Sequence, residues 1–299
     1  MKEQFSNKLR LRKANVAKLS VINDIIEGYI ADGYVITLRQ LYYRLVTRNI
    51  IPNVIREYQK LSNLLKKGRM AGVVDWAAIE DRTRTPYLQY WARDKEDAIN
   101  DTVKQYKLNR QRNQENYVEL WCEKDALSNV LKRKTDHYHI YLMVNRGYSS
   151  VSAMYQAYQR LARAKNEGKF NHILYLGDHD PSGLDMIRDI RDRMAEFGLH
   201  PDVKHIALTA EQIEEYDPPP NPTKFKDPRA KWYINEFGKT CWEVDALPPD
   251  VLHELVEDYV ENLIDIDLFE ETMEEEEKDR AELAKVAKRF AASERRKRK

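Results

Sequence analysis

The segment from residue 173 to residue 183 constrains the fold of this chain more than any other part of its sequence. It begins as an apolar run and then turns abruptly acidic, with Asp178 and Asp180 placed two positions apart. Pro181 and Gly183 follow at once and end the strand, because proline lacks a backbone N–H and glycine lacks a side chain to pack. An amphipathic stretch comes next. The pattern predicts a buried strand that delivers two carboxylates to the exposed end of a sheet.

The same order, an apolar strand followed by an amphipathic helix, repeats along the second half of the chain. The predicted strands cover residues 117–123, 139–145, 172–178, 203–208 and 240–244, and the predicted helices cover 125–134, 150–165, 183–196 and 249–264. Strands that alternate with helices are typical of a mostly parallel sheet that is covered on both faces. The sequence therefore predicts an α/β domain over residues 117–265.

The ends of two of these strands carry a predicted metal site. One strand ends in Glu123, and another leads into Asp178 and Asp180. Open α/β sheets place their chemistry at strand ends, and Mg²⁺ prefers oxygen ligands and works beside phosphates. We therefore expect Glu123, Asp178 and Asp180 to hold Mg²⁺, with Mn²⁺ as the alternative ion. Two simpler interpretations stay open: Asp178 caps the next helix, and Glu123 is an acidic residue in the first turn of a helix.

Residues 1–86 have a different pattern, with three predicted helices followed by a short strand. The helices cover residues 14–31, 38–49 and 56–70, and the strand covers 73–79. This order predicts a winged helix-turn-helix domain, whose third helix commonly enters the major groove of DNA. The candidate DNA contacts are cations on that third helix: Lys60, Lys66, Lys67 and Arg69. Residues 87–116 are predicted to form a charged, mostly helical connector.

The second predicted helix carries a candidate for phosphate chemistry. Its predicted buried stripe consists of side chains at helical spacing: Leu38, Leu41, Tyr42 and Leu45. Tyr43 falls off this stripe and points outward, one turn from Arg39 on the same face. A guanidinium can hold and neutralise a phosphodiester, and a phenol oxygen can attack it. An amphipathic surface tyrosine without chemistry is the alternative that the pattern leaves open.

Charge is unevenly distributed along the chain, although 50 Lys and Arg residues nearly cancel 49 Asp and Glu residues. The N-terminal region is basic, residues 254–277 are strongly acidic, and residues 295–299 are all Arg or Lys. This asymmetry favours an N-terminal module that faces nucleic acid. Residues 266–299 are predicted to form a charged C-terminal helix or tail.

The cysteine content and the hydropathy indicate where the protein works. Two distant cysteines, Cys122 and Cys241, provide neither a four-cysteine zinc site nor a disulfide framework. A reducing compartment is therefore expected. The N-terminus has no apolar leader, and no apolar run approaches membrane-spanning length. We expect a cytoplasmic protein, associated with the nucleoid if the cell is prokaryotic, and no membrane partner.

Two groups of residues resemble a known family. Glu123-Lys124 at a strand end, together with the run DHDPSG at 178–183, resembles the Toprim domain of topoisomerases and related nucleases. The run TLRQLYY at 37–43 resembles the catalytic helix of the topoisomerase VI A subunit and of its meiotic double-strand-break relatives. In that family a winged-helix domain precedes a Toprim domain, which is the order predicted here. The resemblance spans roughly residues 14–264.

The resemblance implies both a fold and a chemistry. The fold would be a winged helix over residues 1–86 followed by a Toprim-type domain over 117–265. Tyr43 would be the nucleophile that forms a 5′-phosphotyrosyl link with DNA, Arg39 would position the phosphate, and the three carboxylates would hold Mg²⁺. The family usually carries a Lys-Gly-Tyr-Pro-like loop between its second and third strands. Here Arg146 stands in place of that Lys, and it is a further candidate DNA contact.

The resemblance also implies partners. Double-stranded DNA would be the substrate, and the family acts as a dimer in which each Tyr faces the metal site of the other subunit. Strand passage would require an ATPase subunit of the B type, because the sequence contains no ATPase segment. Two other functions stay open. A Toprim nuclease would activate water at the same metal site, with Tyr43 incidental. A non-catalytic DNA-binding dimer would use the metal structurally and helix 56–70 for affinity.

Overall fold

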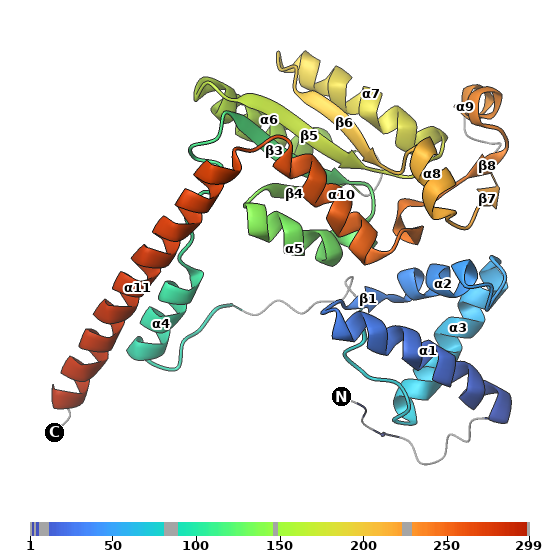
Figure 1. The fold of residues 1–299 in the computed structure, drawn as a ribbon, viewed down its shortest axis with the longest axis horizontal. Helices are drawn as coiled ribbons and strands as arrows, with labels where there is room; N and C mark the ends of the chain where they lie inside the picture. The colour runs from blue at the N-terminus through green and yellow to red at the C-terminus, as the bar shows by residue number, and fades with distance from the viewer. Residues whose placement is uncertain are drawn as a thin grey trace.

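The computed structural model describes residues 2, 4–5, 12–80, 89–145, 149–222 and 229–297. Figure 1 shows a central sheet with helices on both faces, a group of N-terminal helices beside it, and a long C-terminal helix that extends away from it. The chain is therefore α/β, as the sequence predicts.

Four parallel strands form the central sheet in the order β4-β3-β5-β6. They are β3 (Asn116–Cys122), β4 (Tyr141–Val144), β5 (Phe170–Leu176) and β6 (Asp202–Ala207). The two central strands pair in register, with Cys122 opposite Leu176. Because parallel strands end at the same edge of a sheet, Glu123 and Asp178 follow directly after two neighbouring strand ends.

Helices cover both faces of the sheet, and the alternation of side chains along β3 explains why. The helices are α5 (Ser128–Tyr138) and α10 (Pro249–Glu261) on one face, and α6 (Val151–Asn166) and α7 (Pro181–Glu196) on the other (Figure 1). Val118, Leu120 and Cys122 pack with buried residues of α5 and α10. Trp121 points the opposite way and packs with buried residues of α6 and α7. The sheet thus separates two apolar cores.

The first three helices of the chain enclose an apolar core of their own. They are α1 (Lys13–Ala31), α2 (Leu38–Thr47) and α3 (Ile55–Met70), each within two residues of its predicted position. Thr37 caps α2: its hydroxyl accepts from Gln40 N at 3.2 Å, and Gln40 Oε1 accepts from Thr37 N at 2.8 Å. This reciprocal capping box fixes where α2 begins.

The strand that was predicted after the third helix is much shorter in the structure. Only its last residue is in a strand, β2 (Ile79–Glu80), which pairs in parallel with β1 (Ile36–Thr37). Residues 81–86, the end of the predicted N-terminal domain, lie outside the described residues. The structure thus has three helices and a short parallel strand pair here, and the winged-helix assignment stays a prediction.

The last predicted strand, residues 240–244, does not join the central sheet. Its first two residues form β8 (Thr240–Cys241), which pairs antiparallel with β7 (Asn221–Pro222). Trp242 then pairs with His179, through His179 N to Trp242 O at 2.9 Å and Trp242 N to His179 O at 3.1 Å. The segment ends in the 3₁₀ turn η3 (Val244–Ala246). This pairing holds residues 243–245 beside the carboxyl edge of the sheet.

Two shorter helices lie between β6 and β8, at the end of the sheet domain where β7 and β8 also lie (Figure 1). They are α8 (Ala210–Tyr216) and α9 (Ala230–Phe237). A one-turn 3₁₀ helix, η2 (Asp125–Leu127), leads from β3 into α5.

The connector and the C-terminal segment pack against each other. The predicted helical connector contains α4 (Lys95–Gln105), whereas residues 106–115 are not helical. The predicted C-terminal helix or tail is a helix, α11 (Ile266–Lys297), and α4 lies alongside it (Figure 1). No helix among the residues that the structure describes is both long and apolar enough to cross a membrane.

Candidate active site

Glu123 and Asp178 meet at the carboxyl edge of the sheet, as the strand order requires. Glu123 N donates to Leu176 O at 2.9 Å, and Asp178 N donates to Glu123 Oε2 at 3.1 Å. The Glu123 carboxylate is therefore used in part to fix the backbone of the turn after β5. Asp178 is 4% exposed, and its Oδ1 accepts from Val244 N at 3.0 Å. The second oxygen of Asp178 faces Lys124.

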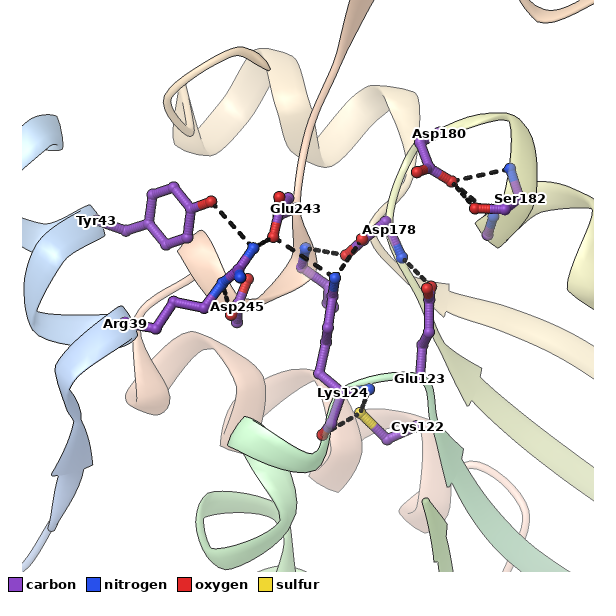
Figure 2. Close-up of polar contacts among 12 residues, drawn as sticks. Arg39, Tyr43, Cys122, Glu123, Lys124, Asp178, Asp180, Ser182, Glu243 and Asp245 are labelled. Carbon is purple, nitrogen blue, oxygen red and sulfur yellow. Dashed lines mark hydrogen bonds and ion pairs between the residues drawn. The ribbon is translucent and has the colours of Figure 1, made fainter. Parts of the chain in front are cut away.

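Asp180 caps helix α7 and does not turn toward Asp178 (Figure 2). Its Oδ1 accepts from Ser182 N at 2.9 Å, from the Ser182 hydroxyl at 2.8 Å and from Gly183 N at 2.7 Å. The capping role that the sequence left open for Asp178 thus belongs to Asp180. The structure brings Glu123 and Asp178 together, and it commits one oxygen of Asp180 to the helix.

Gly183 explains why this turn can be so tight. A Cβ at this position would lie 2.1 Å from the carbonyl oxygen of Asp178 and 3.1 Å from its backbone nitrogen. The first turn of α7 therefore packs directly on the backbone that carries Asp178. Any other residue would push the helix and the carboxylate apart.

Two acids that the sequence reasoning missed complete a cluster with Asp178. Asp178, Glu243 and Asp245 each place a carboxylate oxygen within 4.8 Å of the others. Asp178 and Asp245 are buried and Glu243 is half-buried. The available signal was the acid–X–acid order of Glu243-Val244-Asp245 after an apolar run, the same order as Asp178-His179-Asp180. We refer to Asp178, Glu243 and Asp245 as the acidic trio.

The chemistry of the trio fits a divalent cation. Carboxylate oxygens are the ligands that Mg²⁺ and Mn²⁺ prefer. Asp245 is 1% exposed, and neither of its side-chain oxygens has an aligned hydrogen-bond donor among the described residues. A buried carboxylate without such donors is costly and depends on a nearby cation, which in the structure is Arg39. The trio could therefore hold a metal ion.

Two side-chain cations contact the trio. Lys124 Nζ lies 2.5 Å from Asp178 Oδ2 and 3.5 Å from Glu243 Oε2. Arg39, from α2, pairs with Glu243 and places its Nε 2.7 Å from Asp245 Oδ2 (Figure 2). Burial raises the pKa of Asp178, and Lys124 opposes that rise. Burial disfavours charge on Lys124, but Asp178 and Asp245 outweigh it, so the pKa of Lys124 is raised.

Arg39 links the acidic trio to Tyr43. Arg39 Nη2 donates to Tyr43 Oη at 3.3 Å, and the guanidinium carbon lies 5.5 Å from the centre of the Tyr43 ring. The structure thus brings together the two residues that were predicted for phosphate chemistry. It also brings both of them to the carboxyl edge of the sheet.

The prediction that Tyr43 points outward is wrong in one respect, because the side chain is only 5% exposed. The face of α2 that carries Arg39 and Tyr43 packs against η3. Helical phasing cannot show that a second element covers this face. Burial raises the pKa of Tyr43, and the positive charge of Arg39 works against that rise.

The predicted DNA contacts on α3 have different roles. Lys66 and Lys67 are exposed, and Lys60 is paired with Glu57 at 2.5 Å. Arg69 is half-buried: its Nη2 donates to Ile79 O at 2.6 Å, and its guanidinium lies over the Trp76 ring. Arg69 therefore ties α3 to β2. Arg146 lies outside the described residues.

Compared with family models, with curated proteins and with solved structures, the chain has no match.

Proposed function

We propose that this protein is a Mg²⁺-dependent DNA transesterase resembling a topoisomerase VI A subunit, with Mn²⁺ as the alternative ion. The supporting observation is the position of Arg39. Its guanidinium donates to Tyr43 Oη at 3.3 Å and pairs with Glu243 and Asp245. A side chain suited to phosphate therefore stands between a candidate nucleophile and a candidate metal site.

In the proposed reaction, Tyr43 Oη attacks a phosphorus atom of the DNA backbone. A bond forms between Oη and phosphorus, and the bond from phosphorus to the 3′ oxygen breaks. The phenol proton leaves to water and the 3′ oxygen takes up a proton from water, so one phosphodiester replaces another. Arg39 would neutralise the phosphate, and its charge would also favour the phenolate form of Tyr43 against the effect of burial.

The acidic trio and Glu123 are the residues that would hold the ion. Mg²⁺ bound there would stabilise negative charge on the phosphate and on the leaving oxygen. Lys124, which contacts two carboxylates of the trio, would limit the net negative charge that an incoming phosphate meets.

The same proposal extends to the domains and partners. The N-terminal helices would form a winged-helix domain that binds double-stranded DNA, with Lys66 and Lys67 of α3 among its contacts. The sheet and its helices would form a Toprim-type domain. A second copy of the chain would complete each active site, an ATPase subunit of the B type would supply strand passage, and the protein would act in the cytoplasm.

The second candidate function is a metal-dependent nuclease that activates water. The 5% exposure of Tyr43 favours it, because a covered phenol is poorly placed to reach DNA. The acidic trio needs no tyrosine to activate water. The two candidates differ in their product: a protein-linked DNA end in one case and a free end in the other.

The test is an adduct assay with supercoiled DNA and Mg²⁺ or Mn²⁺, followed by denaturation with detergent. We expect DNA-linked protein with the natural sequence and none with Tyr43→Phe or Asp178→Asn. Tyr42→Phe is the matched control, since the Tyr42 hydroxyl donates to Asn53 Oδ1 at 2.9 Å, whereas the Tyr43 hydroxyl accepts from Arg39. This variant should still form adducts.

Two outcomes would change the conclusion. Cleavage that survives Tyr43→Phe, leaves free ends and is lost in Asp178→Asn would establish the nuclease. DNA binding without cleavage, with or without either ion, would indicate a non-catalytic DNA-binding protein.

A further inference from the structure

The carboxylates of the acidic trio are shared between two cations from different parts of the chain. Lys124 is at the end of β3 and contacts Asp178 and Glu243, at 2.5 and 3.5 Å. Arg39 is on α2 and contacts Glu243 and Asp245. Glu243 Oε2 serves both cations. The oxygens that would ligate a metal ion are therefore the oxygens that bind Arg39 and Lys124.

Shared ligand atoms and repulsion between cations make simultaneous occupation unfavourable. The trio and Glu123 carry four negative charges when ionised, and Arg39 and Lys124 supply two positive ones. A divalent ion on the same oxygens would bring the total to zero, but it would place three cationic groups at contact distance in a largely buried place. Because Glu243 Oε2 already contacts both side chains, at least one of them must then leave the trio.

Arg39 is the cation whose departure has a structural consequence. Its ion pairs join α2 to η3, so they help to dock the N-terminal helices on the sheet domain. The other described contacts of this docking include no carboxylate, although the Arg133 guanidinium of α5 donates to Asp32 O at 3.3 Å and lies over the Tyr34 ring. Asn53 Nδ2 donates to Pro220 O at 2.9 Å, and Tyr34 Oη lies 3.1 Å from His253 Nδ1. Lys124 can turn away without any such effect, because it belongs to the sheet domain itself.

We propose that a divalent cation and Arg39 compete for the acidic trio, so that loading the ion loosens α2 from η3 and releases Arg39 and Tyr43 toward a phosphodiester. This inference rests on the metal site in the proposed function. It gives Glu243 and Asp245 two alternative partners, the ion or the guanidinium. It also gives the buried phenol of Tyr43 a route to DNA that depends on the metal.

Binding linkage provides the test, because an ion that weakens docking must bind more tightly when docking is already weak. Mn²⁺ is titrated by calorimetry into the natural protein, Arg39→Gln and Arg48→Gln. Arg48 is an exposed cation at the end of the same helix. We expect Arg39→Gln to tighten Mn²⁺ binding about tenfold, a typical coupling between two sites, and Arg48→Gln to change it less than twofold.

A neutral variant separates docking from simple charge. Asn53→Ala removes the contact to Pro220 without changing any charge. If ion binding and docking exclude each other, this variant should also tighten Mn²⁺ binding. Hydrogen exchange supplies a second measurement: Mn²⁺ should speed exchange in α2 and η3 of the natural protein, and should leave the amides of β3 and β5 unchanged.

These measurements distinguish a failure of the proposed competition from a failure of the proposed metal site. Equal Mn²⁺ affinity in the natural protein and Arg39→Gln, with loss of binding in Asp178→Asn, would overturn the competition and keep the metal site. Absence of Mn²⁺ binding from every variant would overturn both the metal site and the competition. Slower exchange in α2 on adding Mn²⁺ would show that the ion strengthens docking, against the proposal.

Discussion

Arg39 Nε lies 2.7 Å from Asp245 Oδ2, and this ion pair joins α2 to η3. Asp245 is 1% exposed, and its charge is balanced by Arg39, which belongs to the N-terminal helices and not to the sheet domain. Neither the N-terminal helices nor the sheet domain is electrostatically complete without the other here. The candidate active site is thus formed by packing between two parts of the chain.

Gly183→Ala should disturb the site from the turn beneath it. The new Cβ would lie 2.1 Å from the carbonyl oxygen of Asp178, so the first turn of α7 and the Asp178 backbone must separate. We expect a loss of about 1–3 kcal/mol in the free energy of unfolding, together with weaker Mn²⁺ binding. Chemical denaturation and calorimetry measure the two effects. Gly28→Ala in α1 is the control: outside the adjacent backbone of its own helix, no atom of the described residues would lie within 4 Å of the new Cβ, so it should stabilise by up to about 1 kcal/mol.

The buried carboxylate of Glu119, a residue of β3, should be essential for stability. Glu119 is fully buried and accepts from Arg160 Nε at 2.7 Å and Nη2 at 2.8 Å, with Tyr117 and Trp121 as further donors. Arg160→Met leaves this charge without its cation and should cost about 3–5 kcal/mol in urea denaturation. The double variant Glu119→Leu with Arg160→Met should be more stable than Arg160→Met alone. The exposed Arg163, changed to Met, should have little effect. A cost below about 1 kcal/mol for Arg160→Met would contradict this account.

Attachment of α11 should weaken in acid because of Glu276. This carboxylate is 2% exposed, accepts from Leu108 N at 3.0 Å and pairs with Arg110 at 3.1 Å. Burial acts to raise its pKa, but these contacts prevail and lower the pKa from 4.5 to about 2. A lowered pKa gives stability that is complete above pH 4.5 and is lost as the pH falls toward 2.

Glu276→Gln should therefore reduce the free energy of unfolding at pH 7 by about 1.5–3 kcal/mol, the value of hydrogen bonds to charged groups. It should also flatten the pH dependence below pH 4.5, which denaturation at several pH values would reveal. Glu275→Gln is the matched change on the same helix. Glu275 is exposed and pairs with Arg112 at the surface, so its loss should cost less than about 1 kcal/mol. An unchanged acid profile in Glu276→Gln would assign the effect to other carboxylates.

DNA affinity should depend on Lys66 and Lys67, the exposed cations of α3. Changing both to Gln should weaken binding to all DNA sequences alike and reduce the slope of log Kd against log salt by about 2. Fluorescence anisotropy across a salt series measures this slope. Arg163→Gln with Lys165→Gln removes the same charge from exposed positions of α6 and should leave the slope unchanged. An equal change of slope from the α3 variant and the α6 variant would show that Lys66 and Lys67 are not specific DNA contacts. Arg69 is unsuitable for this test, because its guanidinium donates to Ile79 O and ties α3 to β2, so that its loss would also disturb the fold.

The parts of the fold that local pattern determines could be predicted from the sequence. The central strands are apolar runs between amphipathic helices, and the capping box at Thr37 marks the start of α2 in the sequence itself. Residues 240–244 were misassigned because their apolar pattern does not reveal the neighbour. In the structure that neighbour is Asn221–Pro222, and proline limits the ladder because it has no N–H to donate.

The site could be predicted only in part, because long-range packing completes it. Glu123, Asp178, Arg39 and Tyr43 lie in recognisable local motifs. Glu243 and Asp245 reach Asp178 through the backbone pairing of Trp242 with His179, which no local signal announces. The burial of Tyr43 likewise depends on η3, a turn that is remote in the sequence.

The two cysteines lie beside the residues that matter most, Cys122 next to Glu123 and Cys241 two positions before Glu243. Both thiols are buried, and burial raises the pKa of Cys122 to about 12. A thiol of this kind scarcely reacts with alkylating reagents while it stays covered. The rate at which each thiol is alkylated therefore reports how often the segment around it becomes exposed. Mass spectrometry after brief alkylation would measure this exposure for Cys122 and for Cys241 in the natural protein, without introduced cysteines.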